Sequence, residues 1–185
     1  MYTSGSTGTP KGVTVTHRDV VNGVLALAHS VGIGPGTRVL AGTSVNFDVS
    51  VFEIVTTLAH GGVVEVVQDV LALAERGGWS GGVVSTVPSV LAGILDQVGG
   101  KIHADAVVFA GEALPAALVD RVRDAIPGVR VINAYGQSGV VLRHRLHRRR
   151  DLDRHRGRPH RHAAAQYAHP CARPRPPARG PGSRG

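Results

Sequence analysis

Residues 83–110, VVSTVPSVLAGILDQVGGKIHADAVVFA, contain two apolar runs separated by a segment of helical period. Val83–Thr86 is short and opens with two valines, and Ala106–Ala110 is continuous in apolar residues, as expected of a strand buried on both faces. Between them, Ser89–Val98 follows Pro88 and repeats apolar residues at helical spacing, which predicts a helix. A strand, a helix and a second strand in this order predict a parallel pair of strands.

The same alternation continues on both sides of this unit. Four more strands are predicted, at Val13–Thr16, Arg38–Ala41, Val63–Val67 and Val129–Ile132. Further helices are predicted after Thr16, where Asp19 completes a capping-box pattern, over Asp48–Ala59, and from Pro115 to Ile126. The sequence therefore predicts an α/β fold with a mostly parallel sheet and flanking helices. In such sheets ligands bind beyond the carboxyl ends of the strands.

The composition fits one domain in a reducing compartment. Of the 185 residues, 42% are hydrophobic but only 4% are aromatic, so the core must consist mainly of aliphatic side chains. A single cysteine, Cys171, excludes an internal disulfide framework. No apolar run reaches membrane-spanning length, and no signal-peptide pattern opens the chain. We expect a cytoplasmic protein without a membrane segment.

The net charge of +8 belongs to the end of the chain. Residues 1–142 carry eight basic and eleven acidic side chains, whereas residues 143–185 carry thirteen Arg and two Asp. With so few large apolar residues, we expect residues 140–185 to form a disordered Arg/His/Pro-rich tail. One interpretation is a basic protein that binds nucleic acid through this tail. We favour an out-of-frame segment beginning near Gly136, because Arg, Pro, Gly and Ala have G/C-rich codons, with nucleic-acid binding as an incidental property.

Residues 2–12, YTSGSTGTPKG, combine three glycines, five Ser/Thr hydroxyls and Lys11. Glycines let the backbone approach a ligand, and amide and hydroxyl groups donate to oxyanions, so the segment suits a polyphosphate. It is not a Walker A loop, because Lys11 follows Pro10 and Gly12 stands where Ser or Thr is needed. A flexible Ser/Gly linker is the alternative, but the Pro-Lys-Gly end is not typical of one.

This segment resembles the phosphate-loop signature of the adenylate-forming (AMP-dependent synthetase-ligase) superfamily. That superfamily includes the adenylation domains of nonribosomal peptide synthetases, acyl-CoA synthetases and luciferases. Three more of its motifs follow in order: FDVSVFE at 47–53, AGEAL at 110–114 and NAYG at 133–136. The resemblance covers residues 1–136 and implies that residues 1–139 are part of the large N-terminal domain of such an enzyme.

The resemblance also implies a role for individual residues. The residues implied to bind the ATP phosphates are Thr3, Ser4, Gly5, Ser6, Thr7, Gly8 and Lys11. Of these, Thr7 and Lys11 are the implied catalytic residues. The residues implied to contact adenine and the adjoining phosphate are Gly111, Glu112, Ala113, Asn133, Ala134, Tyr135 and Ser138. The residues implied to line the amino-acid pocket are Asp48, Val49, Phe52, Thr86, Val108, Ala110 and Ala134. No metal ligand is implied, because Gly139 stands where the family has a Glu that helps to hold Mg²⁺.

Three of these residues have a simpler interpretation. Asp48 at a predicted helix start is a natural N-cap, Glu112 is compatible with a solvated loop carboxylate, and Tyr135 with a core aromatic. In amino-acid-activating members, the residue at the position of Asp48 holds the α-ammonium group of the substrate, a charge-assisted contact. Asp48 therefore favours amino-acid activation over the alternative, an acyl-CoA or aryl-acid ligase of the same superfamily. The other pocket positions, apart from Thr86, are apolar and predict an apolar or aromatic amino acid.

The family reaction uses ATP and Mg²⁺ to make an aminoacyl-AMP. The acyl group then passes to the phosphopantetheine thiol of a carrier protein domain in a larger synthetase. We find no signature for the Asp that contacts ribose and no C-terminal subdomain with the catalytic lysine. We therefore expect a fragment of an adenylation domain with little or no activity alone.

Overall fold

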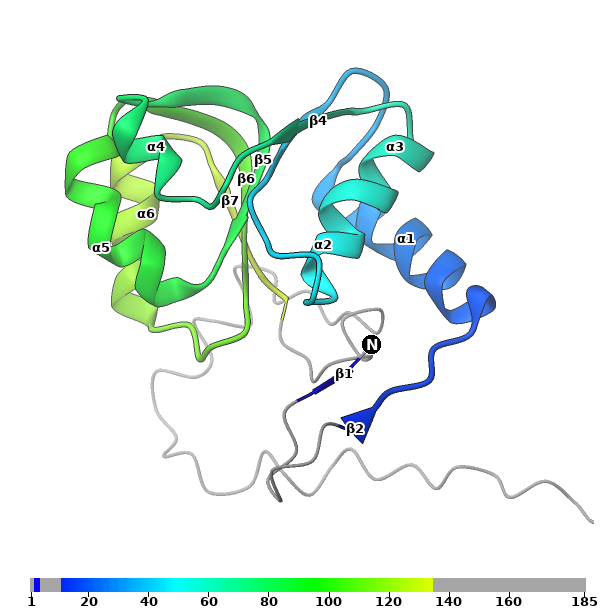
Figure 1. Cartoon of the computed structure of the whole chain (residues 1–185). Helices are drawn as coiled ribbons and strands as arrows, with labels where there is room; N and C mark the ends of the chain where they lie inside the picture. Colours follow the sequence, from blue (N-terminus) through cyan, green and yellow to red (C-terminus); the bar gives the residue numbers. More distant parts are fainter. Residues whose placement is uncertain (1, 4–10, 135–185) are drawn as a thin grey trace, which may run out of the picture.

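The computed structural model describes residues 2–3 and 11–134 (Figure 1). Its centre is a five-stranded sheet in the order β4-β3-β5-β6-β7, in which each strand is parallel to its neighbours. The strands are β3 (Arg38–Ala41), β4 (Val63–Val66), β5 (Trp79–Thr86), β6 (Ile102–Ala110) and β7 (Arg130–Ala134). The predicted parallel α/β fold is confirmed. A separate antiparallel pair is formed by β1 (Tyr2–Thr3) and β2 (Lys11–Gly12).

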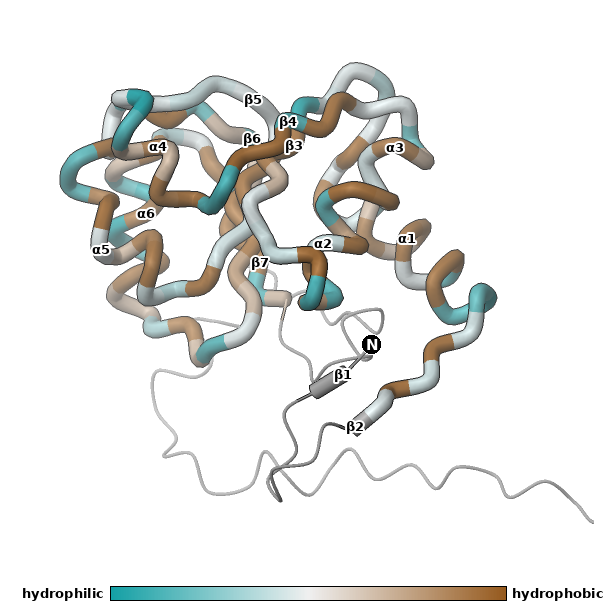
Figure 2. The backbone as a smooth tube through the Cα atoms, viewed as in Figure 1, coloured by the Kyte–Doolittle hydropathy of each residue, from teal (hydrophilic) through white to brown (hydrophobic). Residues whose placement is uncertain are grey.

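Helices cover both faces of the sheet (Figures 1 and 2). One face carries α1 (His17–Val31) and a continuous helical segment made of α2 (Val49–Val51), the π-helical turn η1 (Phe52–Thr56) and α3 (Thr57–Ala59). The other face carries α4 (Ala72–Glu75), α5 (Pro88–Val98) and α6 (Ala116–Ala125). Within the described residues, no helix has the length and apolar character needed to cross a membrane.

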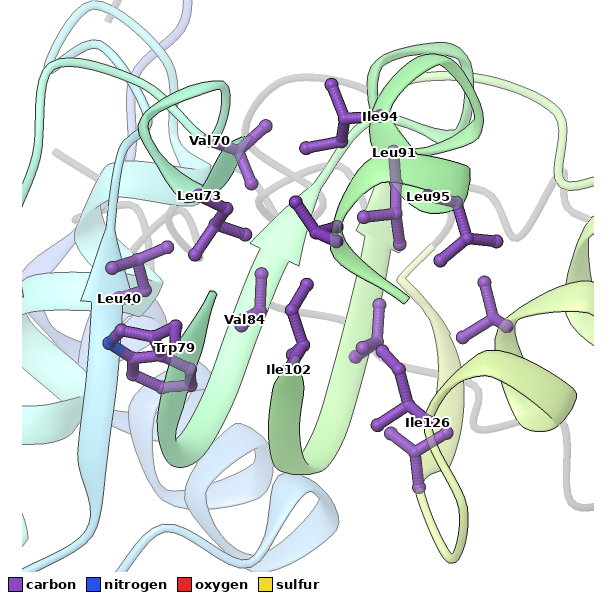
Figure 3. Close-up of a cluster of buried hydrophobic side chains, with 14 of the residues drawn as sticks. Leu40, Val70, Leu73, Trp79, Val84, Leu91, Ile94, Leu95, Ile102 and Ile126 are labelled. Atoms are coloured by element: carbon purple, nitrogen blue, oxygen red, sulfur yellow. The ribbon is translucent and has the colours of Figure 1, made fainter. Parts of the chain in front are cut away.

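Two separate cores result, because successive strand residues point to opposite faces. Val84 packs with Leu73 of α4 and Leu91 and Leu95 of α5 (Figure 3). Its neighbour Val83 packs on the opposite face. There it lies with Leu27 and Val31 of α1, Phe52 of η1, and Val108 and Ala110 of β6. Both faces of the central strands are therefore buried, which explains their nearly continuous apolar sequences.

The capping box predicted for α1 is confirmed. The Asp19 amide donates to Thr16 Oγ1 at 3.2 Å, and the Thr16 amide donates to Asp19 Oδ2 at 3.1 Å. At the other end Gly32 adopts φ 77°, and its amide donates to the Ala28 carbonyl. Arg130 of β7 donates to the Val31 carbonyl at 2.6 Å. Both ends of this helix thus have partners for backbone groups that a helix leaves without intrahelical partners.

Some predicted boundaries are wrong. Residues 13–16 form no strand, although their sequence favours extended backbone; Thr16 instead has the extended conformation of an N-cap. The strand predicted to begin at Val83 begins at Trp79, because Gly81 leaves room for the indole ring of Trp79, which a Cβ at Gly81 would strike. The last strand runs to Ala134 rather than Ile132, so Asn133 belongs to the sheet. The short helix α4 was not predicted.

Glu65 of β4 forms a polar cluster with Arg38 and Trp79, the first residues of β3 and β5. Its carboxylate accepts hydrogen bonds from Trp79 Nε1 (3.0 Å), Arg38 Nη2 (2.7 Å) and Arg76 Nη1 (2.6 Å). The Arg38 guanidinium also lies 6.0 Å from the centroid of the Trp79 ring. The hydrogen bond from Trp79, and then those from both arginines, hold the pKa of Glu65 below its ordinary value of 4.5. The cluster joins β3, β4, β5 and the end of α4.

Replacing Glu65 by Gln is expected to lower the free energy of unfolding at neutral pH by about 1–2 kcal/mol, because charge-assisted bonds are lost. Since the folded-state pKa is lowered, this contribution is present above pH 4.5 and is lost as the pH falls through the folded-state pKa. Thermal unfolding of the native chain and of Glu65→Gln, from neutral pH down to below pH 4.5, measures this contribution. The matched control is Asp96→Asn, which breaks the exposed Asp96–Arg121 pair and is expected to cost less than about 0.5 kcal/mol. Equal effects of the two changes would contradict the prediction.

Candidate functional site at the carboxyl ends of the strands

The predicted pocket residues gather at the carboxyl-terminal edge of the sheet. Val49, Phe52, Val108, Ala110 and Ala134 belong to one apolar cluster, on the face that also carries α1. In the strand register Ala110 pairs with Ala134, so the ends of β6 and β7 lie side by side. Five of the seven predicted positions are thus brought together, although they come from three distant parts of the sequence.

Asp48 lies at the start of the α2–η1–α3 segment and is half-buried. Its φ of −65° and ψ of −21° are helical, and its side chain makes no capping hydrogen bond with α2. An N-cap residue that uses its side chain normally has extended backbone. The structure therefore does not support capping as the role of this carboxylate, whereas Val49 and Phe52, one and four residues on, do line the apolar cluster.

Thr86 is placed differently from the other pocket residues. Along β5, Val83 and Ser85 point toward η1, whereas Val84 packs with α4 and α5. The alternation of the strand puts Thr86 on the side of Val84, and Thr86 pairs with Phe109 in the register. Thr86 is buried at the end of the strand, but the β5 residues on the side of the cluster are Val83 and Ser85.

The sequence prediction missed the most buried charged group, Glu53 of η1, whose side chain has no exposed surface. Glu53 Oε2 accepts from the Thr43 amide at 3.0 Å. Its Oε1 accepts from Thr43 Oγ1 at 2.7 Å and from Ser85 Oγ. Burial raises the pKa of Glu53 above its ordinary value of 4.5, against the opposing effect of the hydrogen bonds from Ser85 and Thr43. Two signals were available: Glu53 is the last residue of the FDVSVFE motif, and it is a glutamate inside an apolar helical pattern, VFEIV.

The predicted adenine loop is tied to helix α5. Glu112 is exposed, and its carboxylate accepts from the Ser89 amide at 3.0 Å and from Ser89 Oγ at 2.8 Å. Val87, the N-cap of α5, supplies no side-chain bond, so Glu112 takes over the capping of this helix from a different loop. Gly111 and Ala113 are exposed beside it. The Glu112 carboxylate therefore caps α5 and is not only a solvated loop group.

Asn133 lies at the end of β7, next to the buried Ala134. Its Oδ1 atom is buried and has no hydrogen-bond partner within the described residues. A buried polar atom of this kind normally requires a partner. A hydrogen-bond acceptor at this edge of the sheet is chemically suited to an amino group such as that of adenine.

The predicted phosphate loop is only partly described. Thr3 of β1 pairs with Lys11 of β2, and this pairing brings the two ends of the Gly-rich segment together. The remaining loop positions Ser4, Gly5, Ser6, Thr7 and Gly8 lie outside the described residues, as do Tyr135, Ser138 and Gly139. Among the described residues, no group of three or more His, Cys, Asp or Glu side chains is placed to hold a metal ion.

Comparison with known proteins identifies the family of the chain. The family model described as AMP-binding enzyme matches residues 1–177, a range that includes part of the segment for which another reading frame is predicted. Chondramide synthase cmdD of Chondromyces crocatus is 39% identical over 150 residues, which are 77% of this chain and 4% of that protein. The L-proline--[L-prolyl-carrier protein] ligase of Streptomyces coelicolor is 35% identical over 176 residues, or 86% of this chain and 32% of the ligase.

Among solved structures, the Vibrio cholerae adenylation domain AlmE in complex with glycyl-adenosine-5'-phosphate is similar, with a TM-score of 0.63 and 25% identity. The match covers 74% of this chain and 27% of that one. The chain therefore spans about a third or less of the length of each of these three relatives.

The titration of Glu53 gives a test of the site geometry. Because the folded-state pKa of Glu53 is raised, its contribution to stability is largest below pH 4.5 and is lost as the pH rises through the folded-state pKa. The stability of the native chain relative to Glu53→Gln is therefore expected to fall from acid toward neutral pH. Unfolding temperatures of both chains from about pH 4 to about pH 8 measure this. A relative stability that rises with pH, as expected for Glu65, would contradict it.

Proposed function

Because the chain belongs to the AMP-binding enzyme family, we propose that it is part of an amino-acid-activating adenylation domain of a nonribosomal peptide synthetase. The observation that carries the proposal is the cluster of Val49, Phe52, Val108, Ala110 and Ala134, with Asp48 at the start of the segment that supplies two of its members. The similarity to peptide synthetases and to a prolyl-carrier-protein ligase supports the same activity.

In the proposed reaction a carboxylate oxygen of the amino acid attacks the α-phosphorus of ATP. The bond from that phosphorus to the bridging oxygen breaks, so that pyrophosphate leaves and an aminoacyl-AMP forms. The thiol of a carrier domain's phosphopantetheine then attacks the aminoacyl carbonyl carbon, and AMP leaves. Negative charge develops on the phosphate oxygens in the first step, so positioning and neutralisation of charge dominate its catalysis.

Individual residues receive proposed roles in this reaction. Thr7 and Lys11, with the rest of the Gly-rich segment, stabilise the departing pyrophosphate. Asn133, through its buried Oδ1 atom, contributes to the adenine site. Asp48 holds the α-ammonium group of the substrate. Among the described residues no group of three or more His, Cys, Asp or Glu side chains is placed to hold Mg²⁺, and no step is assigned to that ion.

The chemistry of the cluster supports an apolar or aromatic substrate side chain. The five pocket residues in this cluster are all apolar, and two of them, Ala110 and Ala134, are small. Among residues 12–134, the other buried charged group of this face, Glu53, is occupied by hydrogen bonds from Thr43 and Ser85.

Replacing Asp48 by Asn tests the proposed substrate anchor. Phenylalanine is expected to bind the native chain more tightly than 3-phenylpropanoate, which lacks the amino group, and the substitution is expected to weaken phenylalanine binding by about tenfold to a hundredfold. Calorimetric or NMR titration measures both ligands. Asp105→Asn, an exposed change of the same charge on β6, is the matched control and should leave both affinities unchanged. Equal binding of the two ligands to the native chain would favour an acyl- or aryl-acid ligase instead.

The 185-residue chain by itself is expected to show no amino-acid-dependent exchange of pyrophosphate into ATP above the blank without amino acid. The reason is that loss of one positioned group from such a site already reduces rates by orders of magnitude, and the chain spans at most about a third of its relatives. The assay uses purified chain with ATP, Mg²⁺ and each proteinogenic amino acid. Robust exchange with any of them would refute this expectation.

A further inference from the structure

The buried Glu53 joins three segments that carry proposed pocket residues. Thr43, which donates twice to its carboxylate, follows β3 and begins the loop that leads to Asp48. Glu53 itself follows Phe52 in η1. Ser85, the third donor, precedes Thr86 at the end of β5. One carboxylate therefore ties together the loop before Asp48, the helical segment after it and the end of a neighbouring strand.

The backbone around Glu53 is arranged to bring this side chain inward. The segment changes from α to π geometry at Phe52–Thr56, and such π turns occur mostly as single turns inside α-helices, frequently at functional sites. Thr57 Oγ1 donates to the Glu53 carbonyl at 2.6 Å, so a side chain supports the backbone of the widened turn. Thr56, also fully buried, has a hydroxyl with no partner within the described residues. Two buried threonines and a buried glutamate in five residues are not what an ordinary core helix contains.

The surroundings of Glu53 hold no compensating cation among residues 12–134, where no ion pair involves it. The loop after β3 presents the amide and hydroxyl of Thr43, β5 presents the hydroxyl of Ser85, and α1 presents apolar side chains on this face. The titratable neighbours on its own segment are Asp48 and His60, and His60 Nδ1 lies 2.8 Å from the Thr56 carbonyl oxygen. A buried carboxylate held only by neutral donors costs stability compared with an apolar residue of the same volume. Packing alone therefore does not account for it.

We propose that Glu53 is a positioning residue for the substrate pocket: its bonds to Thr43 and Ser85 fix the distance between the Asp48–Phe52 segment and the end of β5. This inference rests on the proposed function for the identity of the ligand, but the fixed geometry is a property of the free chain. Oε2 faces an amide that can only donate, whereas Oε1 faces two hydroxyls that can also accept. A glutamine with its oxygen toward the Thr43 amide therefore preserves all three contacts.

Three variants of the full chain separate positioning from packing: Glu53→Gln, Glu53→Leu and Ser85→Ala. Glu53→Leu is expected to weaken phenylalanine binding by about tenfold, with ATP affinity unchanged, and Glu53→Gln to retain native affinity within about threefold. In the free chain, amide hydrogen exchange of Glu53→Leu is expected to rise at residues 43–49 and 85–87 but not in β6 or β7. If Glu53→Leu does not fold, Ser85→Ala decides, because it removes the bond to β5 alone and is expected to weaken phenylalanine binding by a few-fold.

Two outcomes overturn the proposal. One is that Glu53→Leu changes neither the amide hydrogen exchange nor the affinity for phenylalanine. If Glu53→Leu does not fold, the same result in Ser85→Ala overturns the proposal. The other is an equal loss of phenylalanine and ATP binding together with faster exchange throughout the sheet, which indicates a purely structural role. Absence of phenylalanine and leucine binding to the native chain counts against the proposed function instead. In that case the local exchange pattern of the free variants alone supports or overturns the positioning role.

Discussion

The burial of both faces of a parallel sheet is the constraint on which the rest of the structure depends. Parallel strands need connections that return from one end of the sheet to the other, and here helices on both faces provide them. As a result, the segments that leave the carboxyl ends of β3, β5, β6 and β7 all start at one edge. Residues distant in the sequence, such as Phe52 and Ala134, meet there because of topology and not because of local sequence.

Two glutamates hold the sheet in contrasting ways. Glu65 is partly exposed and bound by two guanidinium groups and an indole, so its charge is favoured and the strands around it are joined at little desolvation cost. Glu53 is fully buried and bound only by an amide and two hydroxyls, so its charge is disfavoured. The first arrangement is what stability alone favours. The second is retained at the edge where the proposed pocket lies, which is where a fixed geometry has a functional use.

The elements that the sequence predicts correctly are those that local patterns determine. Apolar runs located β3 to β7, helical spacing located α1, α5 and α6, and the Thr16–Asp19 pair located a cap that the structure contains. It failed where tertiary partners decide. A strand at 13–16 requires a neighbouring strand, and the start of β5 depends on how the Trp79 ring lies over Gly81. Glu53 escaped notice because a glutamate in a helical pattern is usually exposed, and its burial follows from donors on two other segments.

At Asp48 the structure does not support one interpretation that the sequence leaves open, the side-chain N-cap. A helix that starts at Asp48 would normally be stabilised by its side chain, yet the backbone there is already helical and no capping bond forms. The same segment then passes through a π turn and buries a carboxylate and two threonine hydroxyls. Each departure lowers the stability of an isolated helix, and departures from local rules gather where function imposes its own requirements. Asp48, Phe52 and Glu53 are therefore best understood together, as one segment whose departures from ordinary helix geometry the proposed pocket role would explain.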